Sequence, residues 1–232
     1  MPWFEELVKK ILRLRKQEFY VVASGITTSG PPHLGTLMEF IIPSTLAKLI
    51  RRHGIEVEHI FVADVMDAFD SIPAQLKQFK ELEDELGKPL ARVIDPYGCH
   101  NSYGEHFLSE ILRYAEIFDA MPDTVYLSEQ LYNDGWYDHY LKLFYERLDQ
   151  IKEILERTAL RKLPSDWKGI AKPICQKCGR IDSTEVTYFD GSRIGYRCRA
   201  CGHECYVTVE SHEWKLLWRL DWPSRQDFLG VD

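Results

Sequence analysis

Two short apolar runs, separated by a loop and a helical pattern, constrain the fold most. Residues 19–24 are apolar and rich in strand-forming side chains, as in a buried strand, and residues 57–64 have the same character. Between them lie a loop at 25–32 and a helical pattern at 33–53, which Gly54 ends. A strand, a helix and a second strand of these lengths form a βαβ unit, in which the strands are parallel. The sequence therefore predicts an α/β fold with a parallel sheet.

Further elements follow from the periodicity of apolar residues. Helical spacing predicts helices at 4–16, near 75–86, at 102–118 and at 136–161, the last as one long helix. Residues 125–127 are a strand candidate. Residues 164–169 have the composition of a linker, and residues 173–210 change to cysteines, glycines and alternating β-branched and aromatic side chains. This change indicates a small β module behind the parallel sheet.

The composition excludes some classes of protein. The 232 residues carry a net charge of −7, so the chain is no polycation that coats nucleic acid, although a local basic face would suffice to bind one. No apolar run approaches the roughly 20 residues of a membrane span. The sequence begins without a basic segment followed by an apolar core, unlike a signal peptide. We therefore expect a cytoplasmic protein that does not enter a membrane.

Four of the six cysteines form two Cys-x-x-Cys pairs. Cys175 and Cys178 are separated by 19 residues from Cys198 and Cys201, a spacing close to that of zinc-binding knuckles. Four thiolates close a tetrahedral site, which predicts a structural Zn²⁺ rather than a catalytic one. The alternatives are two pairs of ordinary buried cysteines, or competition from two spare donors, His203 and Cys205. Nearby basic residues would suit phosphate contact or a solvated face: Lys177, Arg180, Arg193, Arg197 and Arg199.

The loop after the first strand has the chemistry of a phosphate cradle. Gly25 and Gly30 let the backbone approach a ligand, and Thr27, Thr28 and Ser29 add hydroxyl groups. The following helix offers its unpaired N–H groups to an anion. The alternative is a glycine-rich turn that only caps a helix. The loop matches neither a Walker sequence nor a Gly-x-Gly-x-x-Gly sequence.

A resemblance to a known family starts at this loop. Residues 24–36, Ser-Gly-Ile-Thr-Thr-Ser-Gly-Pro-Pro-His-Leu-Gly-Thr, resemble the first signature of class I aminoacyl-tRNA synthetases, in the version found in class I lysyl-tRNA synthetases. This sequence has Thr28 for a proline and Thr36 for an asparagine. Further blocks resemble the same family in the same order: 63–67, 95–107, 218–225 and 230–232.

The resemblance implies a fold, a reaction and a set of site residues. The fold would be a Rossmann-like parallel sheet in a catalytic domain at 1–165, with a zinc ribbon at 166–212 and a segment returning to the catalytic domain at 213–232. The reaction would join lysine and ATP into lysyl-adenylate, with Mg²⁺, and transfer lysine to tRNA(Lys). The implied catalytic residues are His33, Gly35 and Thr36. The implied ATP contacts are Gly25, Thr27, Ser29, Gly30, His33 and Gly35. The implied lysine contacts are Ser24, Gly25, Asp64, Asp67 and Trp222.

Several alternatives stay open at this stage. Asp64 and Asp67 could orient Mg²⁺, hold a ribose or pair with the lysine ammonium, while Asp70 is expected to be a solvated acid. The aromatic series Trp214, Trp218 and Trp222 is more typical of a hydrophobic core than of a ligand-binding site. Arg219 and Asp221 could pair with each other. Cys99 is expected to be buried and inert, and His100 and His106 are weak substrate-side candidates.

The second class I signature, Lys-Met-Ser-Lys-Ser, does not occur in these 232 residues. We therefore expect an amino-terminal part of such an enzyme, with a carboxy-terminal half carrying this signature and an anticodon-binding domain as a partner. Two rival hypotheses are a noncatalytic paralog that binds tRNA or nucleotide, and a class I synthetase for another amino acid.

Overall fold

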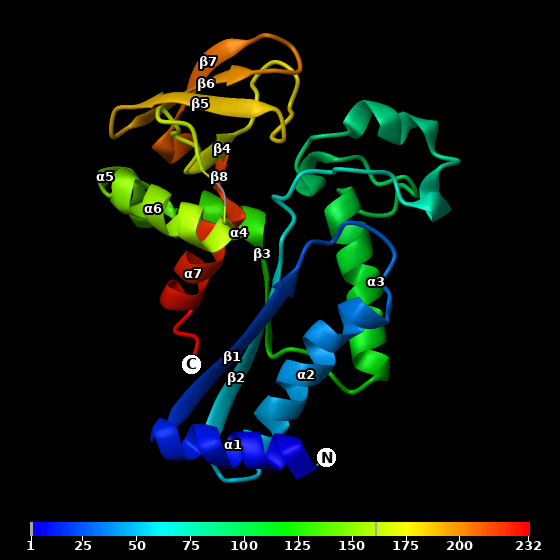
Figure 1. Ribbon diagram of the computed structural model, residues 1–232. Coiled ribbons are helices and arrows are strands. Elements are labelled where there is room, and N and C mark those ends of the chain that lie inside the picture. The colour runs from blue at the N-terminus through cyan, green and yellow to red at the C-terminus, as the bar shows by residue number, and fades with distance from the viewer. Residues whose placement is uncertain (1, 161) are drawn as a thin grey trace.

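A computed structural model describes residues 2–160 and 162–232, and its centre is a parallel sheet (Figure 1). The strands are β1 (Phe19–Ile26), β2 (Glu56–Ala63) and β3 (Thr124–Leu127), in the order β1-β2-β3. The β1–β2 register runs from Phe19 opposite Glu56 to Ile26 opposite Ala63. Strand β3 pairs with the second half of β2, also in parallel. The predicted βαβ unit and parallel sheet are confirmed.

Strand β2 is buried on both faces, which explains its continuous apolar sequence. Phe61 and Ala63 point to one face and pack with residues of α2 (Leu34–Arg51) and α3 (Tyr103–Ile117). The rings of Phe61 and Phe40 are stacked with their centroids 4.1 Å apart. Ile60 and Val62 point to the opposite face and join a larger apolar cluster. Helices α2 and α3 lie against one face of the sheet (Figure 1), so the core has the layered arrangement of an α/β fold.

The helices of this half begin close to the predicted positions. Helix α1 (Pro2–Leu14) packs Val8 against Tyr20 of β1 and Ile50 of α2. Helix α3 begins after Ser102, whose hydroxyl accepts the backbone N–H of Glu105 at 3.2 Å. Such N-caps satisfy donors that have no partner inside the helix.

The charged segment near 75–86 forms no α-helix, and that prediction was wrong. The stretch 74–92, which contains it, forms three 3₁₀ turns: η1 (Ala74–Leu76), η2 (Lys80–Glu85) and η3 (Leu90–Arg92). Its buried leucines, Leu76, Leu82 and Leu90, are spaced too irregularly to share one helix face. They pack instead on the first turns of α3. Segment 65–102 is therefore an irregular excursion beside α3 (Figure 1).

The single helix predicted at 136–161 is two helices, α5 (Asp138–Glu146) and α6 (Leu148–Ala159). Arg147 lies between them with φ −112° and ψ 28°, outside helical values. The break directs Leu141 into the large apolar cluster, while Leu155 is buried farther along. No proline or glycine marks this position, so the apolar periodicity alone could not locate it.

The carboxy-terminal part contains two antiparallel sheets. Strand β4 (Ala171–Pro173) pairs with β8 (Trp214–Leu216), and a second sheet has the order β5 (Thr184–Phe189), β6 (Arg193–Cys198), β7 (Glu204–Thr208). The 3₁₀ turn η4 (Val209–Ser211) precedes β8, and α7 (Trp218–Phe228) follows it. The β4–β8 pair is thus the stem of an excursion that holds the three-stranded sheet. The small β module is confirmed, and its predicted limits at 166 and 212 stay predictions.

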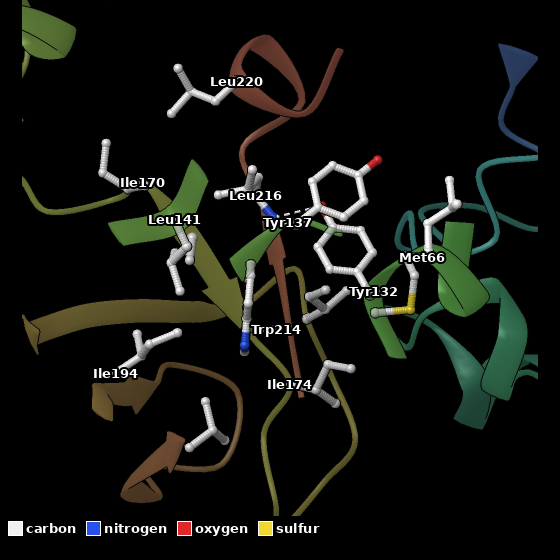
Figure 2. Close-up of a cluster of buried hydrophobic side chains, with 14 of the residues drawn as sticks. Met66, Tyr132, Tyr137, Leu141, Ile170, Ile174, Ile194, Trp214, Leu216 and Leu220 are labelled. Atoms are coloured by element: carbon white, nitrogen blue, oxygen red, sulfur yellow. Dashed lines mark hydrogen bonds between the residues drawn. The ribbon is translucent and has the colours of Figure 1, made fainter. Parts of the chain in front are cut away.

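One large apolar cluster joins the parallel sheet to this excursion (Figure 2). Helix α4 (Ser128–Asn133) contributes Tyr132, whose ring lies stacked 4.0 Å from that of Tyr137. Tyr132 also meets Trp214 of β8 edge-on at 5.4 Å. Ile194 of the antiparallel sheet belongs to the same cluster. The described helices are all too short or too polar to cross a membrane.

Candidate nucleotide pocket and cysteine clusters

An open pocket of about 450 Å³ lies where β1 ends and α2 begins. Ligands of open parallel sheets bind at this edge, beyond the carboxyl ends of the strands. Six predicted site residues line it, together with Ile26 and Pro31: Thr27, Ser29, Gly30, His33, Gly35 and Thr36. Glu39, Pro73, Gln75 and Ile111 contribute other parts of the wall. The structure therefore gathers most of the predicted ATP-contact and catalytic residues around one hollow.

His33 is held at the mouth of this pocket by the first turn of α2. Its Nδ1 accepts the backbone N–H of Thr36 at 3.2 Å, and its own N–H faces the Thr36 hydroxyl at 3.5 Å. This reciprocal pair is a capping box. Because Nδ1 acts as an acceptor, the proton of a neutral imidazole must lie on Nε2. The free edge of the ring is therefore a hydrogen-bond donor, and the Thr36 side chain helps to orient it.

Two glycines near the pocket, Gly30 and Gly35, are closely packed. A Cβ on Gly35 would lie 3.0 Å from Cε1 of His33, so the imidazole rests on the Gly35 backbone. A Cβ on Gly30 would lie 2.8 Å from the Pro73 ring. The hydroxyl of Tyr103 donates to the carbonyl of Ser29 at 2.9 Å, which ties this loop to the start of α3. The loop is thus supported from two sides by segment 65–102 and α3.

Ser24 and Gly25 lie within β1 rather than on the pocket wall. The Ser24 hydroxyl donates to the carbonyl of Glu39, and Ser24 is buried. Gly25 passes so close to the carbonyl of Val62 that no Cβ could be accommodated there. In this structure both residues set the spacing between β1, β2 and α2. Their predicted contacts with ATP or lysine stay predictions.

Asp64 and Asp67, at the end of β2, form ion pairs with a lysine of the chain itself. The Nζ of Lys215 lies 2.8 Å from Asp64 and also contacts Asp67, and Lys215 is 3 % exposed. Thr27 donates its hydroxyl to the other oxygen of Asp67. Burial alone would raise the pKa of Asp64, but Lys215 and Arg225 outweigh it and hold the pKa at about 2. Sequence patterns gave no sign of Lys215, because it lies in the short strand β8.

Asp221 completes this buried charge network, and its predicted pairing with Arg219 is absent. It pairs with Arg225, one helical turn later, and accepts the hydroxyls of Tyr132 at 2.6 Å and Tyr137 at 3.2 Å. Arg225 also reaches Asp64 at 3.2 Å. Arg219 instead lies over the ring of Trp218, with Cζ 4.5 Å from the ring centroid. Helix α7 thus places its acidic and basic groups against the end of β2.

The three tryptophans of the tail have different environments, because Trp214 lies in β8 and the other two in α7. Trp214 is fully buried and donates its indole N–H to the carbonyl of Val209 at 2.9 Å, so the core interpretation is correct for it. Trp218 is 54 % exposed. Trp222 is half-buried and lines a cavity of about 280 Å³ between α6 and α7, with no shared lining residue with the nucleotide pocket. Its predicted lysine contact stays a prediction.

A larger groove, of about 990 Å³, separates α6 and the following linker from the antiparallel sheet. Trp167, Trp218 and six cations line it: Lys162, Lys168, Lys172, Arg197, Arg199 and Arg219. Three acids also line it: Asp166, Asp182 and Glu185. Four of the five predicted basic residues of the module have acidic partners: Arg180 with Asp182, Arg193 with Asp190, Arg197 with Glu204, and Arg199 with Glu185. Exposed ion pairs of this kind are weak, so these arginines can bind another anion in place of the carboxylate.

The four cysteines of the two knuckles converge as predicted. Sγ of Cys175 lies 3.6 Å from Sγ of Cys201, and Sγ of Cys178 lies 3.7 Å from Sγ of Cys198. The two turns have the same hydrogen bonds: Gly179 N–H to Cys175 O, and Gly202 N–H to Cys198 O. Both glycines have positive φ, near +72° and +71°. Cys205 is exposed and lies outside this set.

Sequence reasoning missed a second gathering of metal-binding side chains. Asp95, Cys99, His100 and His106 lie together at the start of α3, although the sequence analysis treated them separately. Cys99 is exposed, so its expected burial was wrong. The spacing Asp-x-x-x-Cys-His-x-x-x-x-x-His does not correspond to one helix face. Only the folded turn before α3 brings the four together.

Comparisons with known proteins agree on one family. The family described as tRNA synthetases class I (K) matches residues 1–232. The chain is 36% identical to a lysine–tRNA ligase of Methanocaldococcus jannaschii, over 100% of this chain and 43% of that protein. Against lysine–tRNA ligases of Pyrococcus horikoshii and Archaeoglobus fulgidus the identities are 37% and 34%, with 44% and 45% of those proteins covered. The chain thus spans less than half the length of these curated relatives.

Proposed function

Because the chain belongs to the family of class I (K) tRNA synthetases, we propose that it forms the lysine-activating part of a lysine–tRNA ligase. Its substrates would be lysine, ATP and tRNA(Lys). The observation that carries this proposal is the pocket at the end of β1, which His33, Gly35 and Thr36 line together with Thr27, Ser29 and Gly30. The proposed activity would place the protein in the cytoplasm.

In the first step, the lysine carboxylate attacks the α-phosphorus of ATP and pyrophosphate leaves. In the second, a terminal ribose hydroxyl of tRNA attacks the lysyl carbonyl and AMP leaves. We assign phosphate binding to the loop at 27–30 and to the Nε2–H of His33, which faces away from its capping contact. A donor fixed in this way stabilises the developing negative charge without reorganising. Mg²⁺ would neutralise the phosphate oxygens of ATP.

For lysine, we propose contacts with Ser24, Gly25, Asp64, Asp67 and Trp222, with Asp67 as the main partner of the ammonium group. The Asp67 side chain is 35% exposed, whereas that of Asp64 is 4% exposed and already paired with two cations. Asp64 would therefore act chiefly by positioning Lys215 and Arg225. A contact from Trp222 would require α7 to move toward the nucleotide pocket.

We further propose that the four knuckle cysteines bind a structural Zn²⁺. Zn–S bonds of about 2.3 Å at tetrahedral angles separate the sulfurs by about 3.8 Å. The Sγ–Sγ separations of the two cysteine pairs, 3.6 and 3.7 Å, are close to that value. The groove beside this module is the proposed site for the acceptor end of tRNA, because it combines six cations with two aromatic rings. The second class I signature would come from residues outside these 232.

The sharpest test is the binding of a non-hydrolysable lysyl-adenylate analogue, measured by calorimetry. We expect saturable binding, weakened at least tenfold by His33→Ala and unchanged by His53→Ala at the exposed far end of α2. Glutamyl and cysteinyl analogues, offered in parallel, are expected to bind more weakly. If either analogue binds more tightly than the lysyl analogue, its amino acid and not lysine is the substrate. No binding of any analogue by a chain that still binds tRNA would favour the noncatalytic paralog.

Lysine-dependent exchange between ATP and pyrophosphate then tests the reaction itself. We expect exchange to require a carboxy-terminal segment with the second signature, because this signature would bind the β- and γ-phosphates of ATP. The segment is supplied from a curated relative. A mixture that binds the analogue but shows no exchange, with an active full-length relative as control, would contradict the proposed activity.

A further inference from the structure

A buried tyrosine fixes one peptide group in the loop at 27–30. The hydroxyl of Tyr103 donates to the backbone carbonyl of Ser29 at 2.9 Å, although 74 positions separate the two residues in the sequence. Tyr103 is fully buried, whereas Ser29 lines the open pocket at the end of β1. The contact therefore connects the interior of the protein to the backbone of the proposed nucleotide site.

The ring of Tyr103 has little freedom to move. It packs against the rings of Phe69 and Phe107, with centroids 4.8 and 4.6 Å away. Tyr103 is the first residue of α3, and its backbone N–H donates to the carbonyl of Val93 at 2.9 Å. Because side chains in a close-packed core keep one rotamer, the hydroxyl is held at one point, and the Ser29 carbonyl is held with it.

The direction of this hydrogen bond is unambiguous. A carbonyl oxygen can only accept, so the proton must come from the hydroxyl of Tyr103. Burial raises the pKa of Tyr103 above its ordinary value of 10, so the hydroxyl keeps its proton at neutral pH. The Ser29 carbonyl therefore points toward the buried ring.

A fixed carbonyl also fixes the N–H group on the other side of the same peptide bond. Peptide groups are planar, and the described residues have no cis bond, so the Ser29 C=O and the Gly30 N–H point in opposite directions. The Gly30 N–H therefore points away from Tyr103. It forms no hydrogen bond with residues 2–160 or 162–232. Because Gly30 lines the pocket, this donor is available to a ligand there.

Pro73 holds Gly30 in place from the same side as Tyr103. A Cβ on Gly30 would lie 2.8 Å from the Pro73 ring and 3.6 Å from the Tyr103 hydroxyl. The protein therefore packs against this side of Gly30 and leaves the pocket as its open side. A backbone donor that is oriented before the ligand arrives binds an anion without reorganising.

We propose that Tyr103 is a positioning residue for nucleotide binding, because it orients the Gly30 N–H toward a phosphate oxygen of the nucleotide. Backbone N–H groups beside a helix N-terminus commonly bind phosphate. The inference rests on the proposed function, since it takes the pocket to be the ATP site. It adds a second donor to the Nε2–H of His33, and it assigns the orientation of that donor to a residue outside the pocket lining.

Nuclear magnetic resonance of the full chain, titrated with AMP and separately with adenosine, tests this proposal. In wild type we expect AMP to move the Gly30 amide proton downfield, because it forms a hydrogen bond with an anionic oxygen, and adenosine to leave it in place. In Tyr103→Phe the affinity for AMP should fall about three- to tenfold, while that for adenosine should change less than about twofold. Phenylalanine keeps the packed ring, so the variant should fold, which circular dichroism checks.

Tyr145→Phe is the matched control. It removes another tyrosine hydroxyl that donates to a backbone carbonyl, that of Lys168 at 3.0 Å, and Tyr145 does not line the nucleotide pocket. We expect this variant to keep the affinities for AMP and adenosine and the position of the Gly30 amide proton.

Equal losses of affinity for AMP and adenosine in Tyr103→Phe would mean that the hydroxyl only stabilises the pocket, and would overturn the proposal. So would an unchanged affinity for AMP, or a Gly30 amide proton that AMP does not move in wild type. The last measurement needs no variant, so it decides the question even if Tyr103→Phe does not fold. These outcomes leave nucleotide binding itself in place, whereas a wild type that binds neither ligand would overturn the proposed function together with this inference.

Discussion

Lys215 and Arg225 link the tail to the carboxyl end of β2, and Lys215 contacts two carboxylates there. Its ammonium group lies between Asp64 and Asp67, while the aliphatic stem is buried with the rest of β8. Removing it would leave the buried carboxylate of Asp64 with only Arg225 and the hydroxyl of Ser128 as partners. Breaking one side of a buried ion pair is costly, because the remaining charge keeps its desolvation penalty.

We therefore expect Lys215→Met to lower the free energy of unfolding by about 3–5 kcal/mol. Urea unfolding followed by circular dichroism at pH 7 measures the change. Lys172→Met is the matched control: Lys172 lies directly opposite Lys215 in β4 but is exposed, and its loss should change stability by at most about 0.5 kcal/mol. Similar effects of the two substitutions would contradict the role assigned to Lys215.

We expect His59, in the centre of β2, to make the free energy of unfolding depend on pH. Burial lowers its pKa from 6.5 to about 4, against the opposing effect of Asp123. Between these two values the unfolded chain binds a proton that the folded chain does not, so stability falls as pH decreases from 6.5 to 4. A shift of this size corresponds to about 3 kcal/mol across that interval.

Unfolding of wild type and His59→Leu at pH 7, 6, 5 and 4 checks this expectation. The variant should lose less stability than wild type as the pH falls, with the difference growing toward pH 4. Other groups titrate over the same interval in both proteins, so only the difference between them reports on His59. Parallel curves for the two proteins would show that His59 does not carry this dependence.

At the scale of elements, we expect the proposed zinc site of the knuckles to stabilise the three-stranded antiparallel sheet. That sheet has few strands, and its two faces are only partly buried. Zinc binding in comparable small modules contributes about 10–16 kcal/mol at pH 7. We expect Cys178→Ala to remove one zinc ion and to speed hydrogen exchange of the amides in β5, β6 and β7 at least tenfold.

The amides of β1 and β2 serve as the internal reference for this measurement, because they pair with each other far from the knuckles. Cys205→Ala should leave both sets of amides unchanged. Unchanged exchange in β5–β7 of Cys178→Ala would mean that the apolar contacts of Ile194 and Tyr196 hold the sheet without a metal.

Elements that depend on short sequence patterns could be predicted, whereas elements that depend on packing against distant parts of the chain could not. The βαβ unit and the knuckles follow from patterns within a few dozen residues, and the structure has them. The break at Arg147 and the 3₁₀ turns near Leu76 and Leu82 arise from packing against distant elements, so periodicity misplaced them. At the site, the loop around His33 was recognisable from its glycines. The partners of Asp64 were not, because Lys215 lies 151 residues away.

At the scale of the whole molecule, the groove of about 990 Å³ between α6 and the antiparallel sheet is the proposed path of tRNA. Trp218 is exposed there, beside Arg219 and opposite Arg197 and Arg199 of the antiparallel sheet. Stacking of a base on an aromatic ring contributes about 1–3 kcal/mol. We expect Trp218→Ala to weaken tRNA binding by about five- to a hundredfold.

Filter binding of tRNA(Lys) at two salt concentrations measures this effect. Trp136→Ala is the control, because Trp136 is also exposed but packs near Phe228, away from the groove. Loss of affinity for tRNA in both variants, or in neither, would contradict the proposal that tRNA binds in the groove.

The ion pairs between the tail and Asp64 also set an order of events during synthesis. Lys215 and Arg225 follow Asp64 by 151 and 161 residues, so both leave the ribosome long after β1, α2 and β2. Until then the end of the central strand carries an uncompensated carboxylate, and one face of the sheet lacks the residues of β8 and α7 that cover it. Contacts so distant in sequence form slowly. The nascent sheet is therefore exposed to chaperones and to aggregation until β8 and α7 have emerged.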